Sequence, residues 1–241
     1  MGAADHVSCL VLVPTYNEAQ NLPALMERLF ALGLPDVAAL VIDDSSPDGT
    51  GELAERLSSL YGERIFVLHR TTKEGLGPAY LAGYKRALEI QPTYVAQMDA
   101  DLSHPPELLP RLLECLESCD VAIASRYVSG GGVAPEWGIA RRLLSRGGNL
   151  YARLITGIPV RDITSGFRCF RREVLERLRE RPIRCRSFGF QVEVAYWAWR
   201  QQFRLREIPF TFALRSNGAS KISANTVLEA LWRLPQLRFT E

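Results

Sequence analysis

Short apolar runs alternate with amphipathic segments of helical length through the first half of this 241-residue chain, and this alternation constrains the fold more than any other feature. The runs that we expect to form strands are 9–13, 37–42, 65–68, 94–98 and 121–124. The segments between them that we expect to form helices are 21–32, 51–61, 77–90 and 106–117. Strands and helices that alternate in this way form a mostly parallel sheet covered by helices on both faces. The sequence therefore predicts an α/β fold with a Rossmann-like sheet.

The second half of the chain is less regular. The elements expected there are a glycine-rich loop at 129–132, a basic helix at 139–156, a loop and short strand at 162–170, a helix at 190–202, a strand at 205–212, a polar loop at 215–221 and a last helix at 225–234. We find no internal repeat and no low-complexity linker that would separate domains. A chain of this length can bury one substantial core, so we expect a single domain over residues 1–241.

The two halves of the chain carry opposite charge. Residues 1–120 contain 8 Lys and Arg against 18 Asp and Glu, a net charge of −10, whereas residues 121–241 contain 21 against 9, a net charge of +12. A basic half of this size suits an anionic phosphate or an anionic membrane surface. It would also suit nucleic acid, but no helix-turn-helix, zinc-finger or RNA-binding signature accompanies it. We therefore expect no nucleic acid partner.

Polar and acidic residues follow three of the predicted strands, at 14–18, 43–50 and 99–101. Ligands of open parallel sheets bind outside the carboxyl ends of the strands, so we expect these clusters to share one site. Asp99 and Asp101 are two positions apart, and on a strand such side chains point to the same face. Two convergent carboxylates could bind one hard cation such as Mg²⁺, which keeps its other positions for diphosphate oxygens. Aspartates after a strand are also common turn residues.

The order and spacing of these clusters resemble family-2 glycosyltransferases of the GT-A fold. The matching motifs are Pro-Thr-Tyr-Asn-Glu at 14–18, Asp-Asp-x-Ser-x-Asp-Gly-Thr at 43–50 and Asp-Ala-Asp-x-x-His-Pro at 99–105. Three further segments look like dolichol-phosphate (polyprenol-monophosphate) mannosyltransferases: Ala-Ser-Arg-Tyr-Val at 124–128, Asp-x-Thr-Ser-Gly-Phe-Arg at 162–168 and Arg-x-x-Gly-x-Ser-Lys at 215–221. The resemblance covers about residues 8–235, nearly the whole chain.

This resemblance implies a metal-dependent, inverting transfer of mannose from GDP-mannose to a polyprenyl or dolichyl monophosphate in a membrane. About 8–125 would be the nucleotide-sugar-binding half, and about 126–241 the acceptor half. The divalent cation, Mg²⁺ or Mn²⁺, would be bound by Asp101 and Asp99, with Ser103 as a weaker ligand that water could replace. A lone histidine beside two prolines is more often structural, so we leave His104 out of the metal site.

The resemblance also implies three sets of site residues. Those expected to bind the nucleotide-sugar are Pro14, Tyr16, Glu18, Ile42, Asp44, Asp99, Ala100, Asp101, Arg126, Arg215 and Lys221. Those expected to take part in catalysis are Asp99, Asp101, Arg126, Arg215 and Lys221. The resemblance places Arg126, Arg141 and Ser145 at the acceptor phosphate. Positions 141 and 145 share a helix face, and guanidinium forks bind phosphate bidentately.

Several residues have a second possible role, which is structural. Asp162, Ser165 and Arg168 would shape the floor of the sugar pocket, although a structural turn explains them nearly as well. Asp43 and residues 48–50 read most simply as turn and helix-start residues. At the level of function, the alternatives are a UDP-sugar such as UDP-glucose as donor, a polysaccharide or small-molecule acceptor, and a non-catalytic nucleotide-sugar-binding scaffold. Both metal carboxylates are present, which argues against the last.

The remaining features of the sequence concern the cellular compartment and membrane association. Five cysteines, an odd number without Cys-x-x-Cys spacing, favour a reduced cytoplasmic protein without a zinc site. We see no signal peptide and no apolar run near the ~20 residues that cross a bilayer, so we expect a soluble protein or one peripheral to the cytosolic face of a membrane. Segment 139–156 could lie in the membrane interface, held by Arg142 and Arg146, or could pack on the sheet as an ordinary amphipathic helix. A small membrane-embedded partner subunit is a further option.

Overall fold

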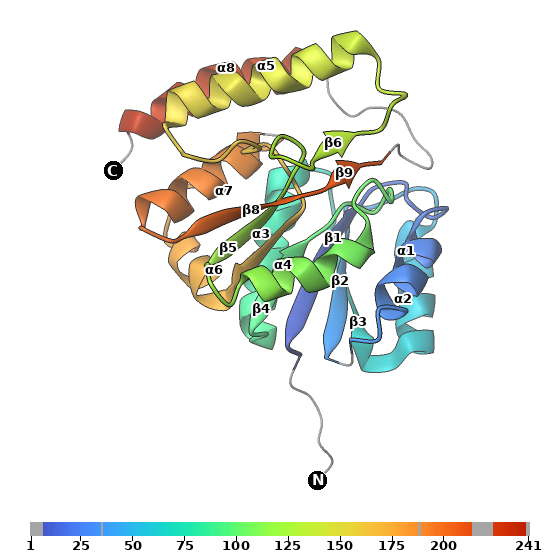
Figure 1. Cartoon of the computed structure of the whole chain (residues 1–241). Coiled ribbons are helices and arrows are strands. Elements are labelled where there is room, and N and C mark those ends of the chain that lie inside the picture. Colours follow the sequence, from blue (N-terminus) through green and yellow to red (C-terminus); the bar gives the residue numbers. More distant parts are fainter. Residues whose placement is uncertain (1–6, 35, 188, 214–223, 240–241) are drawn as a thin grey trace.

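A seven-stranded sheet in the order β3-β2-β1-β4-β7-β5-β8 forms the centre of the molecule (Figure 1). The computed structural model describes residues 7–34, 36–187, 189–213 and 224–239. The strands of the sheet are β1 (Cys9–Thr15), β2 (Val37–Asp43), β3 (Ile65–His69), β4 (Tyr94–Gln97), β5 (Val121–Ser125), β7 (Arg168–Arg171) and β8 (Leu205–Pro209). A small second sheet pairs β6 (Gly132–Val133) with β9 (Thr211–Phe212). All pairings in both sheets are parallel except those of β7, which confirms the predicted α/β fold with a mostly parallel sheet.

Helices cover both faces of this sheet (Figure 1). They are α1 (Leu22–Phe30), α2 (Thr50–Tyr61), α3 (Leu76–Ile90), α4 (Leu109–Cys115), α5 (Ile139–Thr156), α6 (Arg172–Leu178), α7 (Gly189–Arg200) and α8 (Ala224–Gln236), with 3₁₀ turns at Gly62–Arg64, Pro106–Leu108 and Leu237–Phe239. Alternate side chains of β1 enter opposite cores, because successive strand residues point to opposite faces. Val11 packs with α1, α2 and α4, whereas Leu12 packs with α3, α6 and α7.

The structure differs from the sequence-based elements in three places. The segment 106–117 divides into a 3₁₀ turn and the helix α4, which ends at Cys115. The division follows from Pro106 and Pro110, each of which occupies the start of one of these two segments. The strand expected over 205–212 divides at Phe210 into β8 and β9, which belong to different sheets. Helix α6 was not expected, because a helix of seven residues gives too short a periodic pattern.

Helices α5 and α8 run side by side along the top of the molecule in Figure 1, where α8 also packs on α7. The Tyr151 hydroxyl of α5 donates a hydrogen bond to the carbonyl oxygen of Leu231 in α8 at 3.0 Å. Large apolar side chains remain exposed on both helices and on the 3₁₀ turn that follows: Ile139, Leu143, Leu144, Leu150, Leu154, Leu228, Leu231, Trp232 and Phe239. The apolar side chains of α5 therefore do not all face the sheet. Within the part of the chain that the structure describes, no helix is long and apolar enough to cross a bilayer.

Candidate active site

The carboxyl ends of β1, β2, β4 and β5 lie at one edge of the sheet, because these strands run in the same direction. Strand β7 lies antiparallel between β4 and β5, with Arg168 paired to both Gln97 and Ile123. Its first residue is therefore at the same edge, and the preceding loop 161–167 joins the polar segments that follow the parallel strands. The sequence predicted the shared edge and a short strand within 162–170, but not the antiparallel direction of that strand.

The segment after β2 contains the structural turns that the sequence suggested. The Asp43 carboxylate accepts hydrogen bonds from the Ser46 backbone N–H at 3.1 Å and from its hydroxyl at 2.5 Å. Asp48 Oδ1 accepts from the Thr50 backbone N–H at 3.1 Å, one residue after Gly49, whose φ is +83°. Asp48 Oδ2 also accepts from the Ala19 backbone N–H at 3.2 Å, so this turn is tied to the segment after β1. These bonds confirm the turn interpretation of Asp43 and Asp48.

The side chains proposed for the nucleotide lie on the β1–β2 side of the edge. Asp44 is buried and forms an ion pair with Arg70, whose other terminal nitrogen lies 2.6 Å from the Glu74 carboxylate. Burial raises the pKa of Asp44, and Arg70 opposes this rise. The Lys73 ammonium lies 3.5 Å from the centre of the half-buried Tyr16 ring, a cation–π contact.

Other members of the nucleotide set are buried nearby. Glu18 accepts a hydrogen bond from the Asn21 side-chain amide at 2.8 Å, and its backbone N–H donates to the Thr50 hydroxyl. Thr15, which follows Pro14, donates from its hydroxyl to the carbonyl oxygen of Ile42 at 3.3 Å. The structure therefore brings the ends of β1 and β2 into direct contact.

The sequence did not identify Arg70 and Lys73. Both follow β3, the third parallel strand at this edge, and the same rule about strand ends would have selected them. They place two cations beside the acidic and aromatic groups expected to contact the nucleotide.

The two aspartates expected to bind metal lie in a turn rather than on a strand. Strand β4 ends at Gln97, and Leu102 has a φ of +63°, so strand alternation does not set the directions of Asp99 and Asp101. Asp101 is buried, and its Oδ1 accepts from the Ser103 backbone N–H at 3.1 Å and from the Ser103 hydroxyl at 2.6 Å. Asp99, the other member of the pair, keeps 31% of its side chain exposed.

His104 occupies a packed position behind this turn. Its Nδ1 accepts a hydrogen bond from the Asp99 backbone N–H at 3.0 Å, and its ring stacks on Phe167 with 5.2 Å between ring centres. Phe210 and Phe212 contact the same ring edge-on. This environment fits the structural role expected for His104, which positions the backbone of Asp99.

The oxygen ligands that these side chains offer suit a hard divalent cation that also binds oxygen atoms of a substrate. Among the described residues, no three His, Cys, Asp or Glu side chains gather in a way that would hold a metal by themselves. Two carboxylates on one turn, with a hydroxyl donating to one of them, match the requirement of Mg²⁺, which binds one or two carboxylates and completes its shell with phosphate oxygens and water. Asp101 and Asp99 are the side chains that would hold it.

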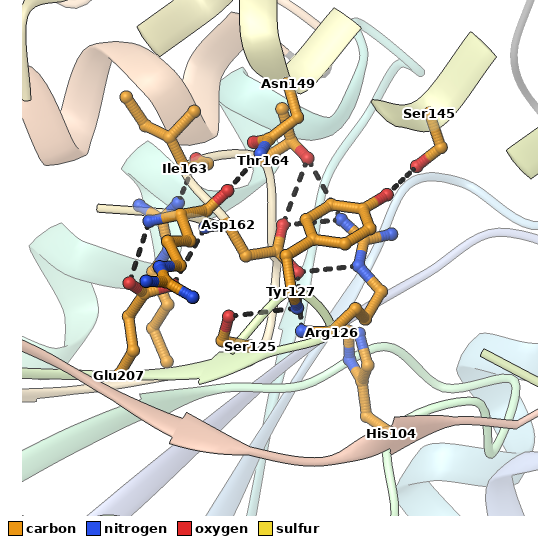
Figure 2. Close-up of polar contacts among 12 residues, drawn as sticks. His104, Ser125, Arg126, Tyr127, Ser145, Asn149, Asp162, Ile163, Thr164 and Glu207 are labelled. Atoms are coloured by element: carbon orange, nitrogen blue, oxygen red, sulfur yellow. Dashed lines mark hydrogen bonds and ion pairs between the residues drawn. The ribbon is translucent and has the colours of Figure 1, made fainter. Parts of the chain in front are cut away.

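Arg126 follows β5 and is held by Asp162, as Figure 2 shows. Asp162 Oδ2 accepts from the Arg126 backbone N–H at 2.8 Å and from its Nε at 2.7 Å, and Oδ1 accepts from Nη2 at 2.7 Å. Nη2 also donates to the Thr164 hydroxyl at 3.0 Å. Burial lowers the pKa of Arg126, but the bonds and charge of Asp162 outweigh it and raise the pKa above its usual value. The sequence did not identify this pairing.

The turn that carries Asp162 is itself held by Glu207 of β8 (Figure 2). The two oxygens of the Glu207 carboxylate accept from the backbone N–H groups of Arg161 and Asp162 at 2.7 and 2.8 Å. Gly131 packs on the other side of the β5 end, where a Cβ would lie 2.4 Å from the carbonyl oxygen of Ser125, so only glycine fits. The Asp162 carboxylate, the Thr164 hydroxyl and the close packing of Gly131 therefore together position Arg126.

The three residues expected at the acceptor phosphate line one cavity of about 510 Å³ between the sheet edge and helices α5, α7 and α8. Arg126 lines it from the end of β5, and Arg141 and Ser145 come from consecutive turns of α5. The Arg141 guanidinium carbon stacks 3.9 Å from the centre of the Trp137 ring. The Ser145 hydroxyl lies 2.7 Å from the Tyr127 hydroxyl, which ties α5 to the residue after Arg126 (Figure 2). Asp99 lines the same cavity.

Of the three residues that the sequence placed at the floor of the sugar pocket, Asp162, Ser165 and Arg168, only Ser165 lines this cavity. Ser165 is buried and lines the cavity. Arg168 is completely buried beneath it, and its two terminal nitrogens donate to the carbonyl oxygens of Gln191, at 2.7 Å, and of Ile163. Burial lowers the pKa of Arg168 to about 10. Arg168 therefore fastens loop 161–167 to the first turn of α7 instead of contacting a ligand directly.

Arg215 and Lys221, expected to bind the nucleotide-sugar diphosphate, lie outside the residues that the structure describes.

Comparison with known proteins gives a consistent result. The model of the family described as glycosyl transferase family 2 matches residues 10–179. A polyprenol monophosphomannose synthase of Mycolicibacterium smegmatis is 42% identical over 228 residues, which cover 94% of this chain and 85% of that protein. An undecaprenyl-phosphate mannosyltransferase of Micrococcus luteus is 42% identical over 222 residues, covering 92% of this chain and 90% of that protein.

A solved structure shows the same fold. The crystal structure of glucosyl-3-phosphoglycerate synthase from Mycobacterium tuberculosis with Mg²⁺ and UDP superposes with a TM-score of 0.71 and 15% sequence identity, covering 97% of this chain and 80% of that one. At this identity the likeness concerns the fold alone, and it confirms the predicted GT-A-like architecture.

Proposed function

The chain belongs to glycosyl transferase family 2, and on that premise we propose that it transfers mannose from GDP-mannose to a polyprenyl monophosphate, giving a polyprenyl-phosphate β-mannose. One observation carries the choice of acceptor. The lining of the cavity combines carboxylate and guanidinium groups, from Asp99, Arg126 and Arg141, with leucines of α5 and α8: Leu143, Leu144, Leu231 and Leu234. An acceptor with an anionic head and an apolar tail fits such a site, whereas a sugar or polysaccharide leaves the leucines without a partner.

In this proposal the first half of one catalytic domain binds the donor, and the second half binds the acceptor and completes the donor site. Residues from about 8 to 125 bind the donor, with the base and ribose near Tyr16, Glu18 and Asp44 and the backbone of Pro14, Ile42 and Ala100. Residues from about 126 to 241 bind the acceptor phosphate through Arg126, Arg141 and Ser145. We propose that Arg215 and Lys221 bind the donor diphosphate as two further cations. The turn containing Asp99 and Asp101 lies where the halves meet.

The reaction needs no general base, because a lipid phosphate is already an oxyanion at neutral pH. A phosphate oxygen forms a bond to the anomeric carbon while the bond from that carbon to the diphosphate breaks, and GDP leaves with the electron pair. Attack opposite the leaving group inverts the α-linked donor to a β-linked product. A divalent cation bound by Asp99 and Asp101 would neutralise the negative charge that develops on the diphosphate. Arg126 holds the attacking phosphate, and Asp162 fixes the direction of that guanidinium.

The transfer test separates this proposal from its closest alternative, a UDP-glucose donor. We expect the purified protein, with Mg²⁺ or Mn²⁺ and a short polyprenyl phosphate, to move labelled mannose from GDP-mannose into the lipid phase. UDP-glucose should give less than about one tenth of that rate, because the 42% identical relatives are named for mannose transfer. Faster transfer from UDP-glucose would replace mannose by glucose in the proposal. Binding of GDP-mannose without transfer to any acceptor would favour the scaffold alternative.

We also propose that the exposed apolar side chains of α5 and α8 rest in a membrane interface, which brings the lipid phosphate to the cavity. These side chains lie on α5 and α8, the same two helices whose leucines line the cavity. Leu143 and Leu144 of α5 both line the cavity and keep 65% and 55% of their surface exposed. An amphipathic helix with basic and apolar side chains is the usual element that binds in the interfacial plane.

Vesicle binding tests this orientation. Replacing Leu150 and Leu154 of α5 by serine should weaken binding to anionic vesicles by about tenfold or more, because each leucine loses the gain of leaving water. Neither side chain lines the cavity, so binding of GDP-mannose should not change. The matched control is Leu60→Ser on α2, which is 75% exposed on another part of the molecule. Equal vesicle binding by both variants would favour a membrane-embedded partner subunit.

The two basic residues of α5 expected to hold it at the membrane are not equally suited to a charge-reversal test. Arg142 donates to the backbone carbonyl oxygens of Ala134 and Pro135 at 3.2 and 2.7 Å, so its replacement would disturb the start of the helix. Arg146 is exposed and is the better position for a charge reversal. Screening at about 0.5 M salt should release much of the bound protein.

A further inference from the structure

Gln191, in the first turn of α7, is a buried polar residue whose side chain the fold does not use. Only 1% of its surface is exposed, yet neither Oε1 nor Nε2 has a hydrogen-bond partner among the described residues. Leaving a buried amide unpaired costs free energy, and such groups in native proteins usually have a ligand or water as partner. Gln191 lines the same cavity as Asp99.

The backbone of Gln191, in contrast, is firmly held. Its carbonyl oxygen accepts a hydrogen bond from the buried Arg168 at 2.7 Å, and Arg168 also binds the carbonyl oxygen of Ile163 in the floor loop. The neighbouring Phe190 ring stacks on Tyr80 with 5.7 Å between centres. The start of α7 is therefore rigid, and it keeps the Gln191 carboxamide at the cavity wall without any bond from the carboxamide itself.

The space beside this carboxamide is bounded by Gly166. A Cβ built on Gly166 would lie 3.6 Å from Gln191 Nε2 and 3.8 Å from Asp99 Oδ1, so one small volume adjoins both side chains. The neighbouring Ser165 hydroxyl is also buried without a hydrogen-bond partner in the described ranges, and it lines the cavity too. Three polar groups thus surround a space next to the proposed metal-binding turn.

We propose that Gln191 binds hydroxyl groups of the hexose that is transferred, with Ser165 beside it, and so helps to select the sugar. A carboxamide offers one acceptor and two donors, and a sugar hydroxyl both donates and accepts, so the two groups satisfy each other. A phosphate dianion only accepts and would leave Gln191 Oε1 unpaired. The site lies next to Asp99 but away from the Tyr16 and Asp44 side of the edge, as the sugar end of the donor requires. This assignment rests on the proposed function.

A Gln191→Met variant tests the proposal, because methionine has a similar size but forms no comparable hydrogen bonds. In titration calorimetry with Mg²⁺ and no acceptor, we expect the dissociation constant of GDP to stay within about twofold of wild type. That of GDP-mannose should rise about tenfold, the loss expected for two neutral hydrogen bonds. The same tenfold loss should appear in kcat/KM for mannose transfer. Gln201→Met, just beyond the C-terminal end of α7 and away from the cavity, is the matched control.

A Gly166→Ala variant provides a second approach that is independent of Gln191 chemistry. Every described atom would be 3.5 Å or more from the new methyl group, which is ordinary contact, so the variant should fold normally. The methyl group would nevertheless fill the space between Gln191 and Asp99. We expect it to weaken GDP-mannose binding at least as much as Gln191→Met does and to leave GDP binding unchanged.

The outcomes distinguish failure of this inference from failure of the proposed function. If the wild-type protein transfers mannose but both variants bind GDP-mannose as the wild type does, Gln191 is no sugar ligand. An equal loss for GDP and GDP-mannose would also overturn it, since Gln191 would then act on the nucleotide or the fold. If the wild-type protein transfers glucose from UDP-glucose instead, the proposed function fails. The dissociation constants of UDP and UDP-glucose for the wild type and the same variants then decide the role of Gln191.

Discussion

Asp101→Asn should reduce sugar transfer by on the order of 10³-fold or more, because it removes a negative charge from the proposed metal site while preserving its shape. Asparagine can still accept the hydrogen bonds from the Ser103 backbone and hydroxyl, at 3.1 and 2.6 Å in the wild type. The fold should therefore survive, and the melting temperature should change little. The measurement is initial-rate transfer at saturating Mg²⁺ or Mn²⁺, alongside a thermal melt.

Two controls define this result. Asp36→Asn removes an exposed carboxylate remote from the site and should leave the rate unchanged. Excess EDTA should abolish wild-type activity, and added Mg²⁺ or Mn²⁺ should restore it. Full wild-type activity in excess chelator would contradict the metal assignment. If the Asp101→Asn protein is inactive but Mg²⁺ or Mn²⁺ still raises its melting temperature, the main metal ligand would be Asp99 instead.

The first half of the fold could be predicted because its signals are local. Each strand is a short apolar run such as the one at β2, and each helix between strands repeats apolar residues at helical spacing. Segment α5 was predicted with its observed bounds, Ile139–Thr156, for the same reason. Turn residues such as Asp43 and Asp48 could also be predicted, since the hydrogen bonds that form their turns reach only two or three positions along the chain.

The features that the sequence did not provide depend on contacts between distant residues. The direction of β7 depends on which strands it pairs with, and no local pattern encodes that. The bond between Arg126 and Asp162 joins residues 36 positions apart. Gln191 lies in a mostly apolar helix that is typical of a core, although a polar side chain in such a helix was itself a signal that we did not use.

Asp162→Asn should lower the free energy of unfolding by about 3–5 kcal/mol, because it leaves the buried Arg126 guanidinium without its counter-charge. Asp162 is fully buried, and 9% of the Arg126 side chain is exposed. In a chain of this size such a loss corresponds to a fall in melting temperature of about 10 °C. Because asparagine has nearly the same volume as aspartate, the expected loss comes from charge and not from a cavity. Transfer activity should also fall, since asparagine offers one acceptor oxygen where Asp162 uses two to aim the Arg126 guanidinium at the acceptor phosphate.

A double variant identifies the cause. Replacing Arg126 by Met together with Asp162→Asn removes both charges, so the melting temperature should recover most of the loss while activity stays low. If the double variant is as unstable as the sum of the two single variants, the ion pair does not explain the loss. Glu207→Gln is the graded comparison, because its amide oxygen can keep one of the two bonds to the backbone of the 161–162 turn. It should cost less stability than Asp162→Asn, and an equal or larger cost would show that the turn, more than the ion pair, holds this side of the site together.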